Sequence, residues 1–262
     1  MSYHETYEFF ALDRCLTAPQ MRALRRISTR ATITPNRFYN WYDWGGLKGS
    51  PSDMLGRYFD LFVHTGNGVP DWGMLRFPSR AIALSNWRPY VAVLRSKARS
   101  SRAASVAVHG KMVVLEMSPA ENSSLPAFEG DESDDSADKW RDDEFPEPAA
   151  WPVPLALMRS RLLSGDLAPL YLLWLLSVQC GDRPFAAAEP PRPAALTMQD
   201  GALHLFAEFL GLNPDLMRAA FENSPGAPRS AGQLLEQARS RRLDGRRRTA
   251  RKSGRGARRA DQ

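Results

Sequence analysis

The chain has 262 residues, of which 43% are apolar and 24% are charged, a composition typical of a soluble globular protein with room for two modest domains. Its longest apolar run, residues 167–178, is well short of the ~20 residues that a membrane-spanning helix needs, and the N-terminus shows no signal-peptide pattern. The two cysteines, Cys15 and Cys180, give neither a disulfide framework nor metal-ligand spacing. We therefore expect a cytoplasmic protein that does not enter a membrane.

The net charge of +6 is divided into three blocks along the chain. Residues 1–118 contain 16 lysines and arginines against 8 acids, a net charge of +8. Residues 119–238 contain 8 against 19, which gives −11, and residues 239–262 contain 11 against 2, which gives +9. Like charges within a block repel one another, whereas opposite blocks attract.

The first predicted elements are a strand and a helix. Residues 7–13, "YEFFALD", are rich in aromatic side chains and predict the strand. A helix then begins after Thr17, because Gln20 stands three residues later as the partner of a capping box. Its apolar positions recur at helical spacing and predict one buried face, with the arginines between them left to solvent.

A second strand and a second helix follow. Residues 31–44, "ATITPNRFYNWYDW", predict a strand that carries aromatic side chains on both faces, and Pro35 suggests an edge position or a bulge. Residues 51–64 predict a helix with Ser50 as its N-cap and Pro51 in its first position. The apolar residues between Met54 and Phe62 predict its buried face.

Three further strands complete the predicted N-terminal domain. Residues 72–78 read as one strand, and residues 104–118 as two strands joined by a turn at His109 and Gly110. The order strand, helix, strand, helix, strand plus a hairpin predicts an α+β fold: a mixed sheet with two helices on one face.

The rest of the chain predicts a linker, a small all-α domain and a tail. Residues 119–150 hold ten acids between Glu129 and Glu147, so we expect a disordered acidic linker between domains at 1–118 and 151–223. Residues 224–262 predict a basic disordered tail with at most a short helix at 231–243. The helices predicted in the second domain cover residues 155–163, 167–179, 198–210 and 214–221.

Several strings in the N-terminal part, "ALDRCLT", "ITPNRFYN", "WGGLKG" and "RYFD", resemble those of a family of uncharacterised bacterial proteins. The likeness covers roughly residues 5–78, and more loosely the helix around "SGDLAPLYLLWLL". It implies a shared fold and a bacterial cytoplasmic setting, and it carries no catalytic residue across because the family has no established activity. This chain has "WGGLKG" where the family tends to have an acid and an aromatic residue.

The glycine-punctuated loop "GGLKGS" is a candidate anion site. A phosphate loop places its lysine and hydroxyl after the last glycine, whereas Lys48 precedes Gly49, so the order is wrong. A glycine-containing loop before a helix still offers N–H groups to an anion, and Lys48 stays a candidate binding residue. The competing interpretation, which we favour, is an ordinary strand-to-helix turn.

The sequence predicts no catalytic residue, no metal site and no cofactor. His4, His64, His109 and His204 are scattered, and none stands at helical spacing from another histidine or from a cysteine. The acids of residues 129–147 lack the glycine and the terminal glutamate of a calcium loop. We interpret them as a solvated charge run.

Two groups of residues are candidates for binding nucleic acid. Tyr39 and Trp41 share one face of the second predicted strand, and aromatic side chains beside arginines on a sheet stack on unpaired bases. Between Trp72 and Leu115 there are eight lysines and arginines and no acid. The tail supplies the second group, which would contact phosphates without sequence preference: Arg246, Arg247, Arg248, Arg251 and Lys252.

These observations leave three functions open. The favoured one is a non-enzymatic adaptor with an unknown protein partner, which predicts an exposed apolar patch on the helical part. The first alternative is nucleic-acid-associated binding through the basic tail and the basic N-terminal block, which predicts a contiguous basic face near Trp41. The second alternative is an enzyme of unrecognised type, which needs a deep pocket with converging polar groups.

Overall fold

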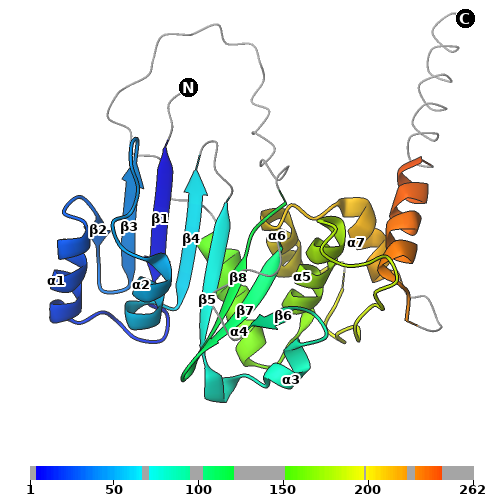
Figure 1. Ribbon diagram of the computed structural model, residues 1–262, viewed down its shortest axis with the longest axis horizontal. Coiled ribbons are helices and arrows are strands. Elements are labelled where there is room, and N and C mark those ends of the chain that lie inside the picture. The colour runs from blue at the N-terminus through cyan, green and yellow to red at the C-terminus, as the bar shows by residue number, and fades with distance from the viewer. Residues whose placement is uncertain are drawn as a thin grey trace, which may run out of the picture.

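A computed structural model describes residues 4–66, 71–94, 103–120, 151–197, 199–222 and 228–243 (Figure 1). The strands are β1 (Glu5–Phe10), β2 (Thr32–Ile33), β3 (Arg37–Tyr42), β4 (Leu61–Gly66), β5 (Trp72–Pro78), β6 (Ala92–Leu94), β7 (Ala104–His109) and β8 (Met112–Met117). They form one sheet of eight strands in the order β2-β3-β1-β4-β5-β8-β7-β6. The sheet is mixed, because β6 and β7 pair in parallel and all other neighbours are antiparallel.

The helices are α1 (Ala18–Ile27), α2 (Pro51–Tyr58), α3 (Leu84–Trp87), α4 (Pro152–Leu163), α5 (Ala168–Gln179), α6 (Gly201–Phe209) and α7 (Pro214–Phe221), with a short 3-10 turn η1 at Ser79–Ala81. A further helix covers residues 231–243. Helices and strands together make an α+β protein, as the sequence predicts.

The first helical layer lies on one face of the β3-β1-β4 part of the sheet. Phe9, Phe38 and Phe62 stand beside one another on neighbouring strands, and they form an apolar cluster with Leu24 of α1 and Leu55 of α2. Both predicted N-caps are present: Thr17 forms a full capping box with Gln20, and Ser50 accepts a hydrogen bond from the N–H of Asp53. Helices α1 and α2 therefore both pack on this face of the sheet.

The second helical layer lies on the opposite face and over the other end of the sheet. Alternate residues of β4, β5, β7 and β8, among them Val63 and Leu75, share one apolar cluster with α4, α5, α6, α7 and the helix at 231–243. Helix α5 lies at the centre of this cluster, since its side chains from Ala168 to Val178 are all buried. Figure 1 shows the two layers at opposite ends of the molecule.

The sequence prediction is wrong where it continues the second helix to residue 64. Helix α2 ends at Tyr58, and Phe59 is its C-cap in an extended conformation. Residues 61–66 then form β4, which pairs with β1 on one side and β5 on the other. Since β4 is covered on both faces, Leu61–His64 are all buried, and the strand lacks the alternation that distinguishes it from a helix.

The predicted strand at 31–44 is also shorter and divided. Residues 34–36 form a turn between β2 and β3, in which the N–H of Thr34 donates to the carbonyl of Arg37 at 2.9 Å. Pro35 lies in this turn, and its carbonyl accepts a hydrogen bond from the N–H of Leu16. The proline therefore ends the pairing of the short edge strand.

The helices predicted after residue 150 are confirmed, with ends shifted by a few residues. Asn213 caps α7 as expected, whereas Asp200 caps α6 and starts it at Gly201. The expected short helix at 231–243 buries Leu234 in the shared apolar cluster. The prediction that the disordered tail begins at residue 224 is wrong for residues 228–243, because Arg229 is buried and the helix at 231–243 packs on the core. Residues 121–150 and 244–262 lie outside the described residues, and the proposed domain boundaries stay a prediction.

Candidate functional site

The aromatic face predicted from the sequence lies on the side of the sheet opposite α1 and α2. Side chains alternate along a strand, so Arg37, Tyr39 and Trp41 of β3 share this face with Glu8 and Phe10 of β1. The register places Glu8 across from Tyr39 and Phe10 across from Arg37. The sequence predicted correctly that Tyr39 and Trp41 share a face.

Arg37 covers this part of the sheet. Its Nη2 donates to Oε2 of Glu8 at 2.8 Å, and its guanidinium carbon lies 4.8 Å from the centre of the Tyr39 ring and 5.7 Å from that of Phe10. Tyr39 is therefore only 8% exposed. Burial raises the pKa of the Tyr39 phenol, and the Glu8 carboxylate raises it further. The positive charge of Arg37 is thus balanced by Glu8, and the face is not basic at this point.

The loop after β3 holds two of the residues discussed from the sequence. Lys48 is exposed, and Trp44 has 84% of its surface in solvent, the most of any large apolar residue in the described part of the chain. Gly45 has a φ of +84°, a conformation that favours glycine and turns the chain towards α2. Trp41 itself is half-buried.

The remaining predicted binding residues, Arg246, Arg247, Arg248, Arg251 and Lys252, lie outside the described residues. Of the predicted binding residues, Tyr39 and Trp41 therefore lie on the same face of β3, and Lys48 lies in the loop after that strand.

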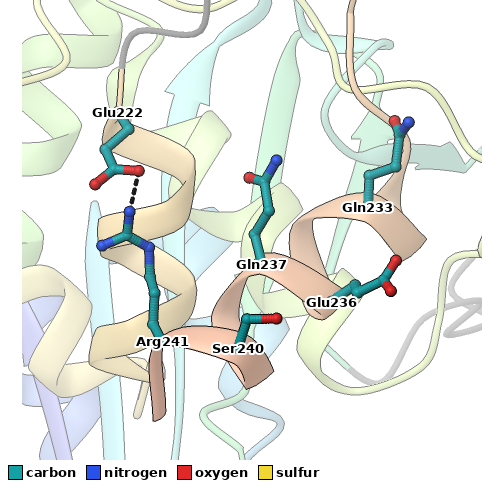
Figure 2. A pocket seen from close by; sticks show the side chains of 6 residues that line it. All are labelled: Glu222, Gln233, Glu236, Gln237, Ser240 and Arg241. Atoms are coloured by element: carbon teal, nitrogen blue, oxygen red, sulfur yellow. Dashed lines mark ion pairs between the residues drawn. The ribbon is translucent and has the colours of Figure 1, made fainter. Parts of the chain in front are cut away.

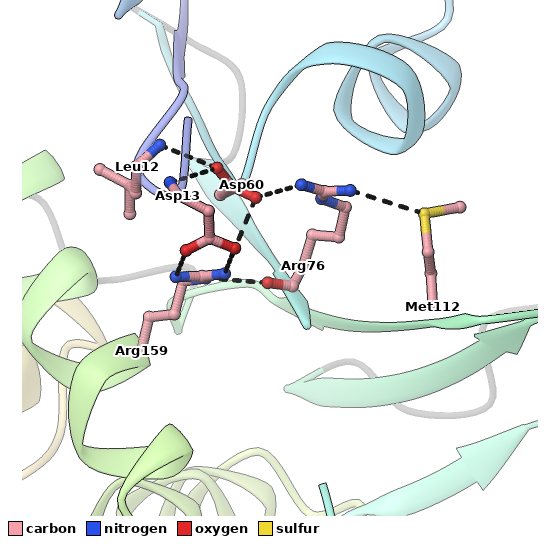
Figure 3. A network of polar contacts seen from close by, with 6 residues as sticks. All are labelled: Leu12, Asp13, Asp60, Arg76, Met112 and Arg159. Carbon is pink, nitrogen blue, oxygen red and sulfur yellow. Dashed lines mark hydrogen bonds and ion pairs between the residues drawn. The ribbon is translucent and has the colours of Figure 1, made fainter. Parts of the chain in front are cut away.

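A buried polar network joins the two ends of the molecule (Figure 3). Asp60, with no exposed surface, accepts hydrogen bonds from the N–H groups of Leu12 and Asp13 and forms an ion pair with Arg76. Arg159 of α4 lies 3.7 Å from the same carboxylate and donates two hydrogen bonds to Asp13. Burial acts to raise the pKa of Asp60, but the N–H of Asp13 and the Arg76 guanidinium outweigh it and hold the pKa below its usual value. Asp60 and Arg159 are buried in this network, whereas Asp13 is partly exposed, and the contacts hold the segment after β1 against β5 and α4.

A second buried network surrounds Arg229. Its guanidinium donates to both carboxylate oxygens of Glu189 at 2.9 and 3.0 Å, and to the carbonyls of Ala219 and Ala220 in the last turn of α7. The hydroxyl of Tyr171 donates to the same carboxylate. Burial raises the pKa of Tyr171, while for Glu189 the bonds from Arg229 outweigh burial and lower the pKa. These contacts attach the helix at 231–243 to the protein.

A third polar group lies between β1 and β4. The Tyr7 hydroxyl donates to Oε2 of Glu5 at 2.5 Å, and Nε2 of His64 lies 3.5 Å from the same oxygen. His64 is only 5% exposed and packs against the Tyr7 ring, with 4.8 Å between ring centres. The His64 side chain is thus buried in the sheet.

One open depression of about 410 Å³ lies between the end of α7 and the helix at 231–243 (Figure 2). It contains the ion pair of Glu222 and Arg241. Its other lining residues are polar and include no histidine, cysteine or buried acid: Gln233, Glu236, Gln237 and Ser240. Among the described residues, no three histidine, cysteine or acidic side chains are grouped so that they could hold a metal ion.

The most distinctive exposed surface lies on α4 and α6. The two helices pack antiparallel, because the rings of Trp151 and Phe209 meet at one end with centres 5.2 Å apart, and Arg161 pairs with Asp200 at the other. The middle of α4 is therefore level with the middle of α6. On their outward faces three large apolar side chains are exposed: Val153 by 64%, Leu157 by 45% and Leu205 by 47%. We call these three residues the α4–α6 patch.

Sequence reasoning missed this patch, although a signal for it exists. The buried residues Leu155, Met158 and Leu162 already form the inward stripe of α4, and one such stripe is enough to attach a helix to a core. Val153 and Leu157 are a second apolar pair, one turn apart and outside that stripe. An apolar pair beyond the buried stripe marks a surface that the described part of the chain does not cover.

No model of a known protein family, no curated protein and no solved structure matches the chain. In the described residues, no single helix is long and apolar enough to cross a membrane; α4 and α5 reach that length and apolarity only as a pair, with a bend of 117° between them.

Proposed function

We propose that the protein is a non-enzymatic adaptor that binds another protein through the α4–α6 patch. The observation that carries this proposal is the exposure of Val153 and Leu157, one turn apart on α4, and of Leu205 on the neighbouring helix α6. Isolated exposed apolar residues are ordinary, whereas adjacent ones on a helical surface mark an interaction site. Among the three functions considered from the sequence, only the adaptor predicts an exposed apolar patch on the helical part.

Two further observations favour an adaptor over an enzyme. The buried carboxylates of Asp60 and Glu189 are both engaged by arginines, and Asp60 accepts two backbone N–H groups as well. The open depression in Figure 2 is lined by polar residues, none of which is a histidine, a cysteine or a buried acid.

The test is site-specific photocrosslinking in the cells that make the protein. A photoreactive amino acid in place of Leu157 should crosslink to one discrete protein. The same amino acid in place of Arg57, which is exposed on α2 on the other face of the sheet, should not. The double variant Val153→Ser and Leu205→Ser should then weaken binding of the purified partner at least about tenfold, which corresponds to ~1.4 kcal/mol.

Three results would contradict the proposal. One is the absence of a discrete product from position 157, and another is the same product from positions 157 and 57. A product of twice the chain's own mass would replace the adaptor with a self-associating protein. Since the substituted side chains are exposed, the thermal unfolding midpoint should be unchanged, which separates a loss of binding from a loss of folding.

A further inference from the structure

Helix α1 presents a row of arginines on a rigid support. Leu24 is completely buried, and Met21 and Ile27 are partly buried in the apolar cluster beneath the helix. Arg22 and Arg26 stand one turn apart on α1 and are exposed. Because the opposite side of the helix is packed on the sheet, these guanidinium groups are held outward at the edge of the molecule where α1 lies in Figure 1.

The third exposed arginine, Arg30, lies beyond the end of α1, in a segment that Arg25 holds. Nη1 of Arg25 donates to the carbonyls of Thr29 and Ala31 at 2.9 and 2.6 Å, which fixes the turn that carries the exposed Arg30. Arg25 also lies in the last turn of α1, where a cation favours the negative end of the helix dipole. Arg25 thus has a structural role, whereas Arg22, Arg26 and Arg30 make no such contact within the described residues.

The charge of this row is not neutralised by the described protein. Residues 14–42 contain six arginines and neither a lysine nor an acid. In the described ranges no acidic side chain forms an ion pair with Arg22, Arg26 or Arg30, while Arg37 pairs with Glu8 on the other face of the sheet. Within the described ranges, the three exposed arginines therefore have no ion-pair partner.

We propose that Arg22, Arg26 and Arg30 form a binding surface for the phosphate backbone of nucleic acid. Arg22 and Arg26 are separated by one turn, a rise of ~6 Å, and one strand of duplex DNA presents a phosphate every ~3.4 Å along its axis, so the two arginines match phosphates about two nucleotides apart. The guanidinium group binds phosphate through two parallel hydrogen bonds, and the exclusive use of arginine suits this geometry. Contacts of this type position a protein on nucleic acid without reading its sequence.

The experiment uses the full-length chain and two triple variants of equal charge. The first replaces Arg22, Arg26 and Arg30 by Gln. The second replaces Arg80, Arg88 and Arg239, which are also exposed and lie on η1, after α3 and on the helix at 231–243. Each variant lowers the net charge from +6 to +3. Their binding to a labelled single strand and a labelled duplex of 20 nucleotides is measured between 50 and 200 mM salt.

In the first variant we expect the slope of log affinity against log salt to fall by about 2 on the single strand and nearly 3 on the duplex. Between 50 and 200 mM salt, the variant should therefore lose roughly 20- to 40-fold less affinity than the unmodified protein loses. The control variant should keep the slope of the unmodified protein. Equal changes in both triple variants would overturn the proposal, because only the net charge would then matter. The protein is also tested with a glutamate polymer of the same length. If this polymer binds as tightly as the nucleic acid, and if its binding depends equally on the three arginines, the partner would be an acidic protein and the proposal would be wrong.

Discussion

Arg159 of α4 donates two hydrogen bonds to the carboxylate of Asp13, at 2.8 and 2.7 Å, although 146 positions separate them in the chain. The same arginine donates from Nε to the carbonyl of Arg76 and lies over the ring of Phe77 at 5.6 Å. One side chain thus connects the segment after β1, the strand β5 and the helix α4.

Replacing Arg159 by Met should lower the free energy of unfolding by about 3 kcal/mol. Removing one partner of a buried ion pair leaves the other charge without compensation, which typically costs about 3–5 kcal/mol. We expect the lower end because Asp13 is partly exposed and regains water. The measurement is denaturant unfolding, with Arg218→Met as the control; Arg218 is exposed beside Asp215, and its loss should cost less than about 1 kcal/mol. Equal losses in the two variants would contradict this account.

Asp60 should make the stability of the protein depend on acid pH. Its pKa in the folded protein lies below the unfolded value of about 3.9, so its stabilising effect is present above that value and is lost as the pH falls through the folded pKa. Asp60→Asn keeps the size of the side chain and removes the charge. The difference in unfolding free energy between the two proteins should be largest above pH 5 and should shrink below pH 4. A difference that stays constant down to pH 2 would show that the charge is not responsible.

Phe59 and Lys48 test the interpretation of the segment around α2. Phe59 has no exposed surface and packs beside Phe9, with 5.2 Å between ring centres, so Phe59→Ala should destabilise the protein by about 3–5 kcal/mol. Lys48 is exposed, and Lys48→Ala should leave stability unchanged within about 0.5 kcal/mol. Thermal and denaturant unfolding measure both. If Lys48→Ala lost the binding of an anion but kept its stability, the loop that contains Lys48 would be an anion site after all.

Arg229 should control the attachment of the helix at 231–243. Arg229→Met leaves Glu189 buried without its cation and removes the donors that satisfy the carbonyls of Ala219 and Ala220. Hydrogen exchange should therefore accelerate in the last turn of α7 and in residues 231–243, and remain unchanged in α1. Arg239→Met, on the exposed side of the same helix, provides the control. Faster exchange across the whole protein would mean that Arg229 supports the fold generally.

The sequence predicts most elements correctly because their ends carry local signals. Thr17 with Gln20 and Asn213 before Pro214 are capping residues that act within one turn. The turn at Gly110 likewise has the positive φ that its glycine suggests. In each case the information lies within a few neighbouring residues.

The errors arise where distant contacts decide the structure. Leu61–His64 read as a continuation of a helix, because only the pairing with β1 and β5 and the cover on both faces make them a strand. The covering of Tyr39 by Arg37 depends on Glu8 from another strand. The α4–α6 patch depends on the antiparallel packing of two helices that are separated by α5 in the chain.

The offset of the two helical layers has a practical consequence for shorter versions of the protein. Without residues 151–243, the strands β4, β5, β7 and β8 would present Val63, Leu75, Phe77 and Leu115 to water on one continuous face. Such a sheet surface promotes aggregation. We expect residues 1–118 produced alone to be insoluble, and to be recovered in solution when residues 151–243 are produced in the same cell. Cleavage between 121 and 150 should accordingly yield two fragments that elute together in size-exclusion chromatography, and their separate elution as folded proteins would contradict this expectation.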